Sequence, residues 1–313
     1  MNYAVIDLGS NTMRLSVYEY IEGRIHRIYS KKAIAGLALY THDKVLDMAG
    51  IKKACSIIND FKKTAYKFVE EANLRLFASA SLRNIENRDE AIKFIVEETS
   101  LTPDVLEGNE EAALGYIGAS YFTNCENGVM IDIGGASTEL VLFKDSVAEK
   151  LVSLPVGCLN LSVEHVSEVI PKAKEWKKIR AVVKEQLTKV DWEKGYECPL
   201  MVGIGGTLRA ALTLSGALFG LSPEQSEIQA SHVKEMIKRL KNEQGDLYQT
   251  IYKNTPDRLM TISTGLVILQ QAIKKFGCEA ISVSRYGLRE GYLMDRMLAN
   301  YEKRSIHERR RED

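Results

Sequence analysis

Two short segments of the chain combine an aspartate with a glycine turn between apolar stretches. The first is D-L-G-S-N-T, from Asp7 to Thr12, and the second is D-I-G-G-A-S, from Asp132 to Ser137. A glycine-rich turn exposes successive backbone N–H groups that can hold phosphate oxygens. A carboxylate beside bound phosphate would repel it unless Mg²⁺ lies between them, directly or through water. The two segments therefore predict two phosphate-binding turns that work with a divalent cation.

The same pattern recurs at one fixed offset, which indicates a duplication. Asp7 and Asp132 are 125 positions apart, and the same offset aligns Arg14 with Glu139. Each turn is followed by an alternating apolar segment, and a third strand is expected at 24–30 in the first half and at 149–154 in the second. Each half then continues into alternating helices and strands, so we predict two α/β domains. They cover residues 1–122 and 123–297, and a last helix over about 298–313 packs back on the first domain or frays.

Apolar spacing places the remaining elements. A long amphipathic helix is predicted over 46–72, with strands at 74–78, 200–204 and 280–284. Further helices are predicted at 88–98, 110–122, 171–188, 206–216, 231–241 and 258–276.

Four more segments carry a family pattern. They are A-S-A-S-L-R-N at 78–84, G-N-E-E-A at 108–112, G-I-G-G-T at 203–207 and S-R-Y-G-L-R-E-G at 284–291. Together with the two turns they resemble the exopolyphosphatase and guanosine pentaphosphate phosphohydrolase family. The resemblance implies two duplicated actin-like ATPase (ribonuclease H-like) domains with substrate in an interdomain cleft. The chain stops at residue 313, so we expect a short form that lacks the C-terminal helical domains of long members. Ala136 stands where the family usually has a third glycine.

The resemblance also implies roles for single residues. Glu111 is the base that activates the attacking water, with Glu110 as the adjacent catalytic candidate. Asp7, Asp132 and Glu139 hold or position Mg²⁺, and Glu139 also counts among the catalytic residues. The residues expected to bind phosphate are Gly9, Ser10, Asn11, Thr12, Arg83, Gly134, Gly135, Ala136, Ser137, Gly205, Gly206 and Thr207. A carboxylate can accept a proton from water held in line with phosphorus, and an arginine can fork onto phosphate oxygens.

Some residues keep two interpretations on sequence alone. Glu110 and Glu111 would also suit a helix N-terminus electrostatically. Arg14 points either to the cleft or to solvent, and Arg289 belongs either to the site or to a surface Arg–Glu pair. Lys31 and Lys32 either line a channel for an anionic chain or end a solvated strand.

Composition limits the class of protein. Lys plus Arg and Asp plus Glu number 42 each, so no global field favours nucleic acid. The five cysteines form no C-x-x-C pair, which argues against a zinc site and a disulfide framework. Without a basic leader or a long apolar span we expect a cytoplasmic protein with no membrane partner. The oligomeric state stays open, a homodimer included.

The predicted function is an exopolyphosphatase-type hydrolase that releases terminal orthophosphate. The sequence does not choose between inorganic polyphosphate and guanosine pentaphosphate, because both end in the same phosphoanhydride. Two alternatives remain: a kinase of the same superfold, and a non-catalytic sensor of guanosine tetraphosphate or pentaphosphate. No segment plainly supplies the acceptor site that a kinase needs.

Overall fold

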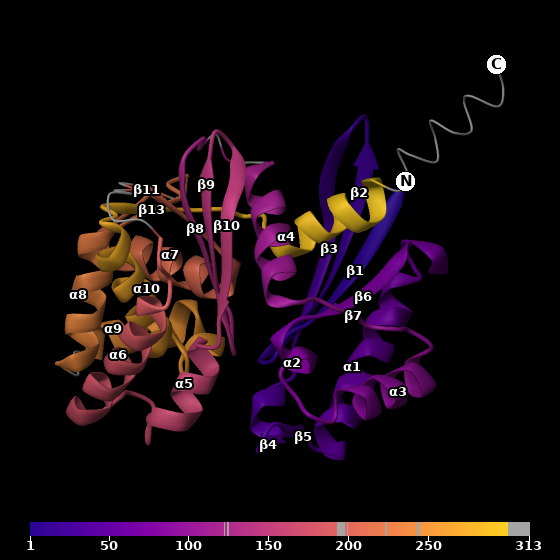
Figure 1. Cartoon of the computed structure of the whole chain (residues 1–313), viewed down its shortest axis with the longest axis horizontal. Helices are drawn as coiled ribbons and strands as arrows, with labels where there is room; N and C mark the ends of the chain where they lie inside the picture. Colours follow the sequence, from indigo (N-terminus) through magenta and orange to yellow (C-terminus); the bar gives the residue numbers. More distant parts are fainter. Residues whose placement is uncertain are drawn as a thin grey trace. The chain divides into compact units, whose positions relative to one another are not determined.

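The computed structural model describes residues 1–299 except 122, 124, 193–197, 199, 223 and 243–244. The described part of the chain divides into two compact units (Figure 1), one made of Met1–Leu114 with residues 289–299 and the other of Gly115–Leu288. From residue 300 on, the helix predicted over about 298–313 lies outside the described residues. No helix in this described part has the length and apolar character needed to cross a membrane.

The first unit is built around a five-stranded sheet with strand order β3-β2-β1-β6-β7. Its strands are β1 (Asn2–Leu8), β2 (Thr12–Ile21), β3 (Arg24–Ile34), β6 (Leu74–Ala78) and β7 (Asp104–Val105). The first three are antiparallel, whereas β6 runs parallel to β1 and β7 parallel to β6. The other elements are the hairpin β4 (Thr41–His42) and β5 (Val45–Leu46), with α1 (Met48–Ala65), α2 (Ala80–Arg83), α3 (Arg88–Thr99), the start of α4 (Gly108–Ser120), and most of α11 (Leu288–Tyr292) with its π-helical continuation Leu293–Leu298.

The second unit contains a six-stranded sheet with strand order β10-β9-β8-β11-β13-β12. Its strands are β8 (Gly128–Ile133), β9 (Thr138–Lys144), β10 (Val147–Leu154), β11 (Leu200–Ile204), β12 (Glu227–Gln229) and β13 (Ala280–Val283). Its helices are α5 (Cys158–His165), α6 (Ala173–Thr188), α7 (Gly205–Phe219), α8 (Ala230–Lys241), α9 (Gly245–Asn254) and α10 (Ile262–Phe276).

The two sheets repeat one plan, which confirms the predicted duplication. Each begins with three antiparallel strands, and a parallel strand then pairs with the first of them, β6 with β1 and β11 with β8. The chain reaches that parallel strand through helices, as a parallel connection requires. The register repeats as well, because Asp7 pairs with Arg14 and Asp132 pairs with Glu139.

Each unit buries an apolar core of its own. In the first unit, Ile58 and Phe61 from α1 are fully buried with Ile6 and Leu15 from the sheet. In the second unit, the core gathers residues of β8, β9 and the helices α6, α7, α8 and α10. The sheet and its helices in each unit therefore fix the turns at the strand ends.

The boundaries of several predicted elements hold, and three predictions need correction. The strands at 74–78 and 200–204 match β6 and β11, and the helix at 88–98 is α3. The helix predicted to run to residue 72 ends at Ala65, because Phe68 leaves the helix to stack on Tyr29, with ring centroids 5.2 Å apart. The third strand runs on to Ile34, so Lys31 and Lys32 lie inside a strand and do not end it. The helix predicted over 258–276 begins at Ile262.

Candidate functional site

The turn after β8 is held through its carbonyl groups. The Gly134 N–H donates to the Ser137 carbonyl at 2.9 Å, which closes the turn. The carbonyl oxygens of Gly134 and Gly135 accept from the Cys158 and Leu159 N–H groups of α5 at 2.9 and 2.8 Å. The first turn of α5 thus satisfies its own exposed donors and anchors the carbonyl side of the glycine turn.

The close approach of α5 depends on Gly157, which sequence reasoning missed. A Cβ atom at this position would lie 2.4 Å from the backbone of Gly135 and Ala136. The Gly157 N–H donates to the Asn160 side-chain oxygen at 2.9 Å, and the Asn160 amide donates to the Ala136 carbonyl at 3.3 Å. A Gly-x-x-Asn spacing at the start of a short apolar segment is the only sequence signal for this cap.

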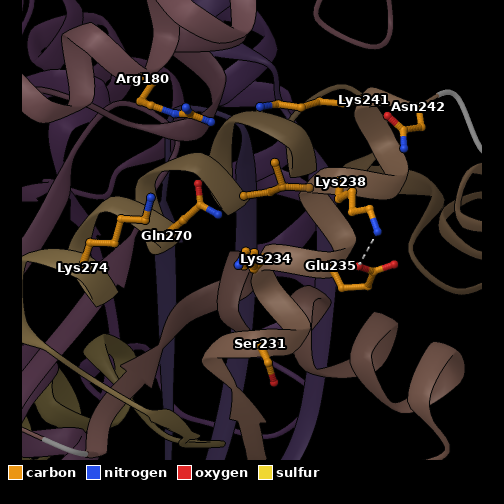
Figure 2. Close-up of a pocket in the computed structure, with 10 residues that line it drawn as sticks. Arg180, Ser231, Lys234, Glu235, Lys238, Lys241, Asn242, Gln270 and Lys274 are labelled. Carbon is orange, nitrogen blue, oxygen red and sulfur yellow. Dashed lines mark ion pairs between the residues drawn. The ribbon is translucent and has the colours of Figure 1, made fainter.

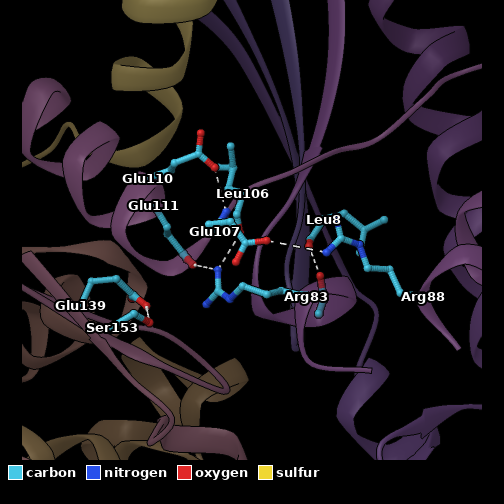
Figure 3. A network of polar contacts seen from close by, with 10 residues as sticks. Leu8, Arg83, Arg88, Leu106, Glu107, Glu110, Glu111, Glu139 and Ser153 are labelled. Atoms are coloured by element: carbon cyan, nitrogen blue, oxygen red, sulfur yellow. Dashed lines mark hydrogen bonds and ion pairs between the residues drawn. The ribbon is translucent and has the colours of Figure 1, made fainter. Parts of the chain in front are cut away.

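Asp132 lies at the end of β8, between two other elements of the predicted site. Its register partners are Glu139 in β9 and Ile204 in β11. Opposed residues of an antiparallel pair point to the same face, so the Asp132 and Glu139 carboxylates share one face of the sheet. Glu139 is buried and accepts a hydrogen bond from the Ser153 hydroxyl at 2.7 Å (Figure 3).

The G-I-G-G-T segment at 203–207, which leads into α7, packs against Asp132. Gly205 has a φ of 84°, and a Cβ atom there would lie 2.0 Å from Asp132 Oδ1. The Thr207 hydroxyl donates to the Ile133 carbonyl at 2.8 Å. The second unit therefore brings together four predicted site residues: Asp132, Glu139, Gly205 and Thr207.

Arg258 is a second residue that the sequence did not reveal. Its guanidinium lies against Gly206, where a Cβ atom would be 2.1 Å from Arg258 Nη2. It also pairs with Asp257, with 3.4 Å between Nε and Oδ2. No periodicity or motif marked Arg258, because it belongs to the short 3₁₀ segment Pro256–Arg258.

The turn after β1 is anchored in the same manner as its counterpart. The Asn11 carbonyl accepts from the Ala35 and Gly36 N–H groups at 3.0 and 2.8 Å, and the Ser10 carbonyl accepts from the Ala38 N–H at 3.2 Å. At Gly9, a Cβ atom would lie 2.7 Å from the Thr12 carbonyl oxygen.

Arg83 and Glu111 form a buried ion pair in the first unit (Figure 3). Arg83 ends α2 and Glu111 lies in the first turn of α4. Arg83 Nη1 lies 2.8 Å from Glu111 Oε2 and donates to the Leu106 carbonyl at 2.8 Å, and the two side chains are only 11% and 10% exposed. A buried guanidinium and carboxylate in contact are costly unless paired, so each requires the other for its position.

Glu110 has different hydrogen-bond and ion-pair partners from Glu111. Its Oε2 accepts from the Glu107 N–H at 3.0 Å, which caps α4, and its Oε1 lies 2.9 Å from Arg296 Nη2. The side chain is 45% exposed. The two adjacent glutamates are therefore distinguished by burial and by partners.

A family model described as the Ppx/GppA phosphatase family matches residues 16–300. The chain belongs to this family. Among curated relatives it is 28% identical over 296 residues to a guanosine-5'-triphosphate,3'-diphosphate pyrophosphatase of Aeromonas hydrophila, covering 93% of this chain and 58% of the relative. It is 25% identical over 306 residues to a bifunctional 3-dehydroquinate synthase/phosphatase of Fusobacterium nucleatum, covering 90% and 44%. The chain thus spans about half the length of these relatives.

Solved structures of the Ppx/GppA type have the same fold. The Aquifex aeolicus member of the family superposes with a TM-score of 0.77 at 24% identity, covering 96% of this chain and 98% of that one. An exopolyphosphatase from Cytophaga hutchinsonii superposes with a TM-score of 0.80 at 18% identity, covering 94% and 97%. With the repeated sheet order, these likenesses confirm the predicted fold of two duplicated α/β domains.

The other arginines of this Ppx/GppA chain differ in their surroundings. Arg14 is half-buried beside Asp7 in register and donates to the Ser30 hydroxyl at 3.3 Å. Arg289 is 8% exposed, so its interpretation as part of a surface pair is wrong. The next residue, Glu290, is 1% exposed and accepts from the Tyr18 hydroxyl at 2.7 Å. Burial, and then the Glu290 charge, raise the pKa of Tyr18 well above its ordinary value.

The Asp132–Glu139 pair has the chemistry of a magnesium site. Mg²⁺ is usually held by one or two carboxylates, with waters and substrate phosphates as the remaining ligands. Among the residues that the structure describes, no group of three or more His, Cys, Asp or Glu side chains is placed to hold a metal ion. The Asp132 and Glu139 carboxylates on one sheet face are the oxygen donors that Mg²⁺ takes, and they would supply only part of its coordination.

Proposed function

We propose that the chain is a phosphohydrolase that releases terminal orthophosphate from inorganic polyphosphate or guanosine pentaphosphate. Membership of a phosphatase family supports this proposal. The observation that carries it is the buried Arg83–Glu111 pair, which sets a carboxylate 2.8 Å from a guanidinium at the start of α4. A phosphate-binding cation beside a proton acceptor is what hydrolysis of a phosphoanhydride requires.

The residues divide the proposed reaction among themselves. Arg83 would fork onto phosphate oxygens, and the N–H groups of the two glycine turns would hold others. Glu111 would accept the proton of the attacking water. Because the carbonyl sides of both turns are hydrogen-bonded to neighbouring backbone, their fixed shape would cost no reorganisation on binding.

Asp132 and Glu139 would hold Mg²⁺ in this proposal. Bound there, the cation would neutralise charge on the phosphate oxygens. Gly205 and the Ser153 hydroxyl would position the two carboxylates, because one lies against Asp132 and the other donates to Glu139. Arg258, against Gly206, would add a positive charge beside the start of α7.

The adjacent glutamates provide the test. Glu111→Gln should lower phosphate release by roughly 10²–10⁴-fold because it removes the proton acceptor. It should leave polyphosphate binding intact, because the amide oxygen can still accept from Arg83 and keep that guanidinium in place. Glu110→Gln is the matched control and should leave release near normal, because it loses only the ion pair with Arg296 while its amide oxygen can still cap α4. Release would be measured with magnesium and no acceptor alcohol, from long polyphosphate, short polyphosphate and guanosine pentaphosphate side by side.

Each result decides between named alternatives. Release without an acceptor contradicts a kinase, and binding without turnover favours the sensor. Loss of release in Glu110→Gln with near-normal Glu111→Gln would shift the base by one residue. If neither substitution lowered release, the hydrolytic mechanism would be wrong.

A further inference from the structure

A basic pocket lies in the second unit, away from the glycine turns of that unit. It has a volume of about 610 Å³ and is lined from α6, α8 and α10. Five cations line it: Arg180 from α6, Lys234, Lys238 and Lys241 from α8, and Lys274 from α10 (Figure 2). None of the residues given a phosphate or metal role above lines this pocket. We refer to it as the α6–α8–α10 pocket.

Lys241 feels the positive charges of two other lining cations, Arg180 and Lys274. Figure 2 shows Arg180 and Lys241 pointing toward each other. Burial, followed by the charges of Arg180 and Lys274, lowers the pKa of Lys241. Like charges held together by the fold destabilise it unless an opposite charge joins them.

The carboxylate of the pocket does not relieve this repulsion. Glu235 pairs with Lys238, with 3.6 Å between Nζ and Oε2, and Figure 2 shows this pair apart from Arg180 and Lys241. Within the described ranges, Arg180, Lys241 and Lys274 form no ion pair. The pocket therefore keeps a strong excess of positive charge.

Two buried polar atoms in the lining also lack partners. Among the described residues, Arg180 Nε and Gln270 Oε1 have no hydrogen-bond partner, and Gln270 is only 8% exposed. Buried polar groups are nearly always hydrogen-bonded, and an orphan needs an explanation. A ligand that accepts from Arg180 would supply one, and the Gln270 amide can turn either its oxygen or its NH₂ group to that ligand.

We propose that the α6–α8–α10 pocket is a second anion site that binds a short oligophosphate. Several cations from three helices exceed what one carboxylate or sulfate would neutralise, and linked phosphates can reach more than one of them. Arginine forks onto phosphate oxygens and lysine meets them as a point charge. This assignment goes beyond the hydrolase proposal and does not depend on it, because the site needs no Glu111 and no metal.

Trp176 makes the pocket observable. Lys241 Nζ lies 5.4 Å from the centre of the Trp176 ring. The chain has two tryptophans, so Trp192→Phe leaves Trp176 as the sole fluorophore. Inorganic tripolyphosphate, titrated in EDTA to prevent turnover, should change its emission as the ammonium group shifts toward the anion.

The decisive comparison uses two lysine variants in the Trp192→Phe protein. Lys274→Met removes one lining cation and should weaken tripolyphosphate binding about tenfold. Lys178→Met removes an exposed α6 cation that does not line the pocket and should leave binding unchanged. Guanosine diphosphate, titrated in parallel, distinguishes a nucleotide from an inorganic chain as the source of the phosphates.

Calorimetry on the same variants gives a second readout if the emission does not change. About tenfold weaker tripolyphosphate binding in Lys274→Met alone would support the site. Equal affinities in Lys274→Met, Lys178→Met and the parent would overturn it. Binding that persists in Glu111→Gln, when that variant no longer releases phosphate, separates this proposal from the proposed function.

Discussion

Replacing Gly205 by alanine places a methyl carbon against a carboxylate oxygen of Asp132. The added Cβ would lie 2.0 Å from Asp132 Oδ1, whereas ordinary contacts begin at 3.4 Å, so the two groups must separate by 1.4 Å. Mg²⁺ demands near-ideal geometry at about 2.0–2.1 Å from its ligands. If Asp132 holds the metal, Gly205→Ala should raise the magnesium concentration for half-maximal phosphate release by roughly 10–100-fold.

The same substitution also strains the backbone, and that cost must be separated from the displaced carboxylate. Gly205 has a φ of 84°, and a left-handed conformation costs a non-glycine residue about 1–2 kcal/mol. For a domain of this size each kcal/mol lowers the melting temperature by about 2–4 °C. Gly220 ends the same helix with a φ of 70°, and a Cβ atom added there would have no neighbour within 4 Å.

Gly220→Ala is therefore the matched control. Both variants should lose similar melting temperature in calorimetry, and only Gly205→Ala should need more magnesium in the phosphate-release assay. An equal magnesium requirement in the two variants would refute the assignment of Asp132 as a metal ligand. A much larger decrease in melting temperature for Gly205→Ala alone would show that the steric clash shifts the backbone and its packing rather than the Asp132 carboxylate.

Two further substitutions follow from buried hydrogen bonds. Glu139→Gln should raise the magnesium requirement strongly, whereas Ser153→Ala should raise it about tenfold, since a hydrogen bond to a charged carboxylate contributes about 1.5 kcal/mol or more. The reverse order would mean that Glu139 does not hold metal. Tyr18→Phe removes the hydrogen-bond donor to Glu290, a carboxylate that is 1% exposed. In urea titrations it should lower the free energy of unfolding by about 1–3 kcal/mol. An unchanged urea midpoint would show that other groups suffice to stabilise the buried carboxylate.

Much of the fold could be predicted because its signals are local. The strand at 74–78 and the helix at 88–98 follow from apolar spacing alone, and the duplicated turns follow from one fixed offset. The end of α1 could not be predicted, because apolar spacing continues to Phe68, whereas in the structure Phe68 lies beyond the helix and stacks on Tyr29 of β3. Lys31 was predicted at the end of a strand, but β3 continues to Ile34 and Lys31 Nζ lies 2.6 Å from Asp60 Oδ2 of α1. A pairing between a strand and a helix has no local signal in the sequence.

The site was predictable where motifs carry it and not where tertiary contacts do. Arg83 and Glu111 were singled out by their motifs, but their ion pair joins segments 28 positions apart and has no local signal. Gly157 and Arg258 were missed because their importance lies in what they touch, namely Gly135 and Gly206. Such contacts become visible only once the chain is folded.

The strand registers beside the two turns show how the two halves of the duplication differ. Asp7 and Asp132 occupy the same position in two copies of one strand pair, but their partners, Arg14 and Glu139, have opposite charges. The first copy sets an arginine opposite its aspartate, whereas the second sets two carboxylates opposite each other. If Asp132 and Glu139 hold Mg²⁺ as proposed, a difference of charge at one strand position would suffice to give the two halves of the duplication different tasks.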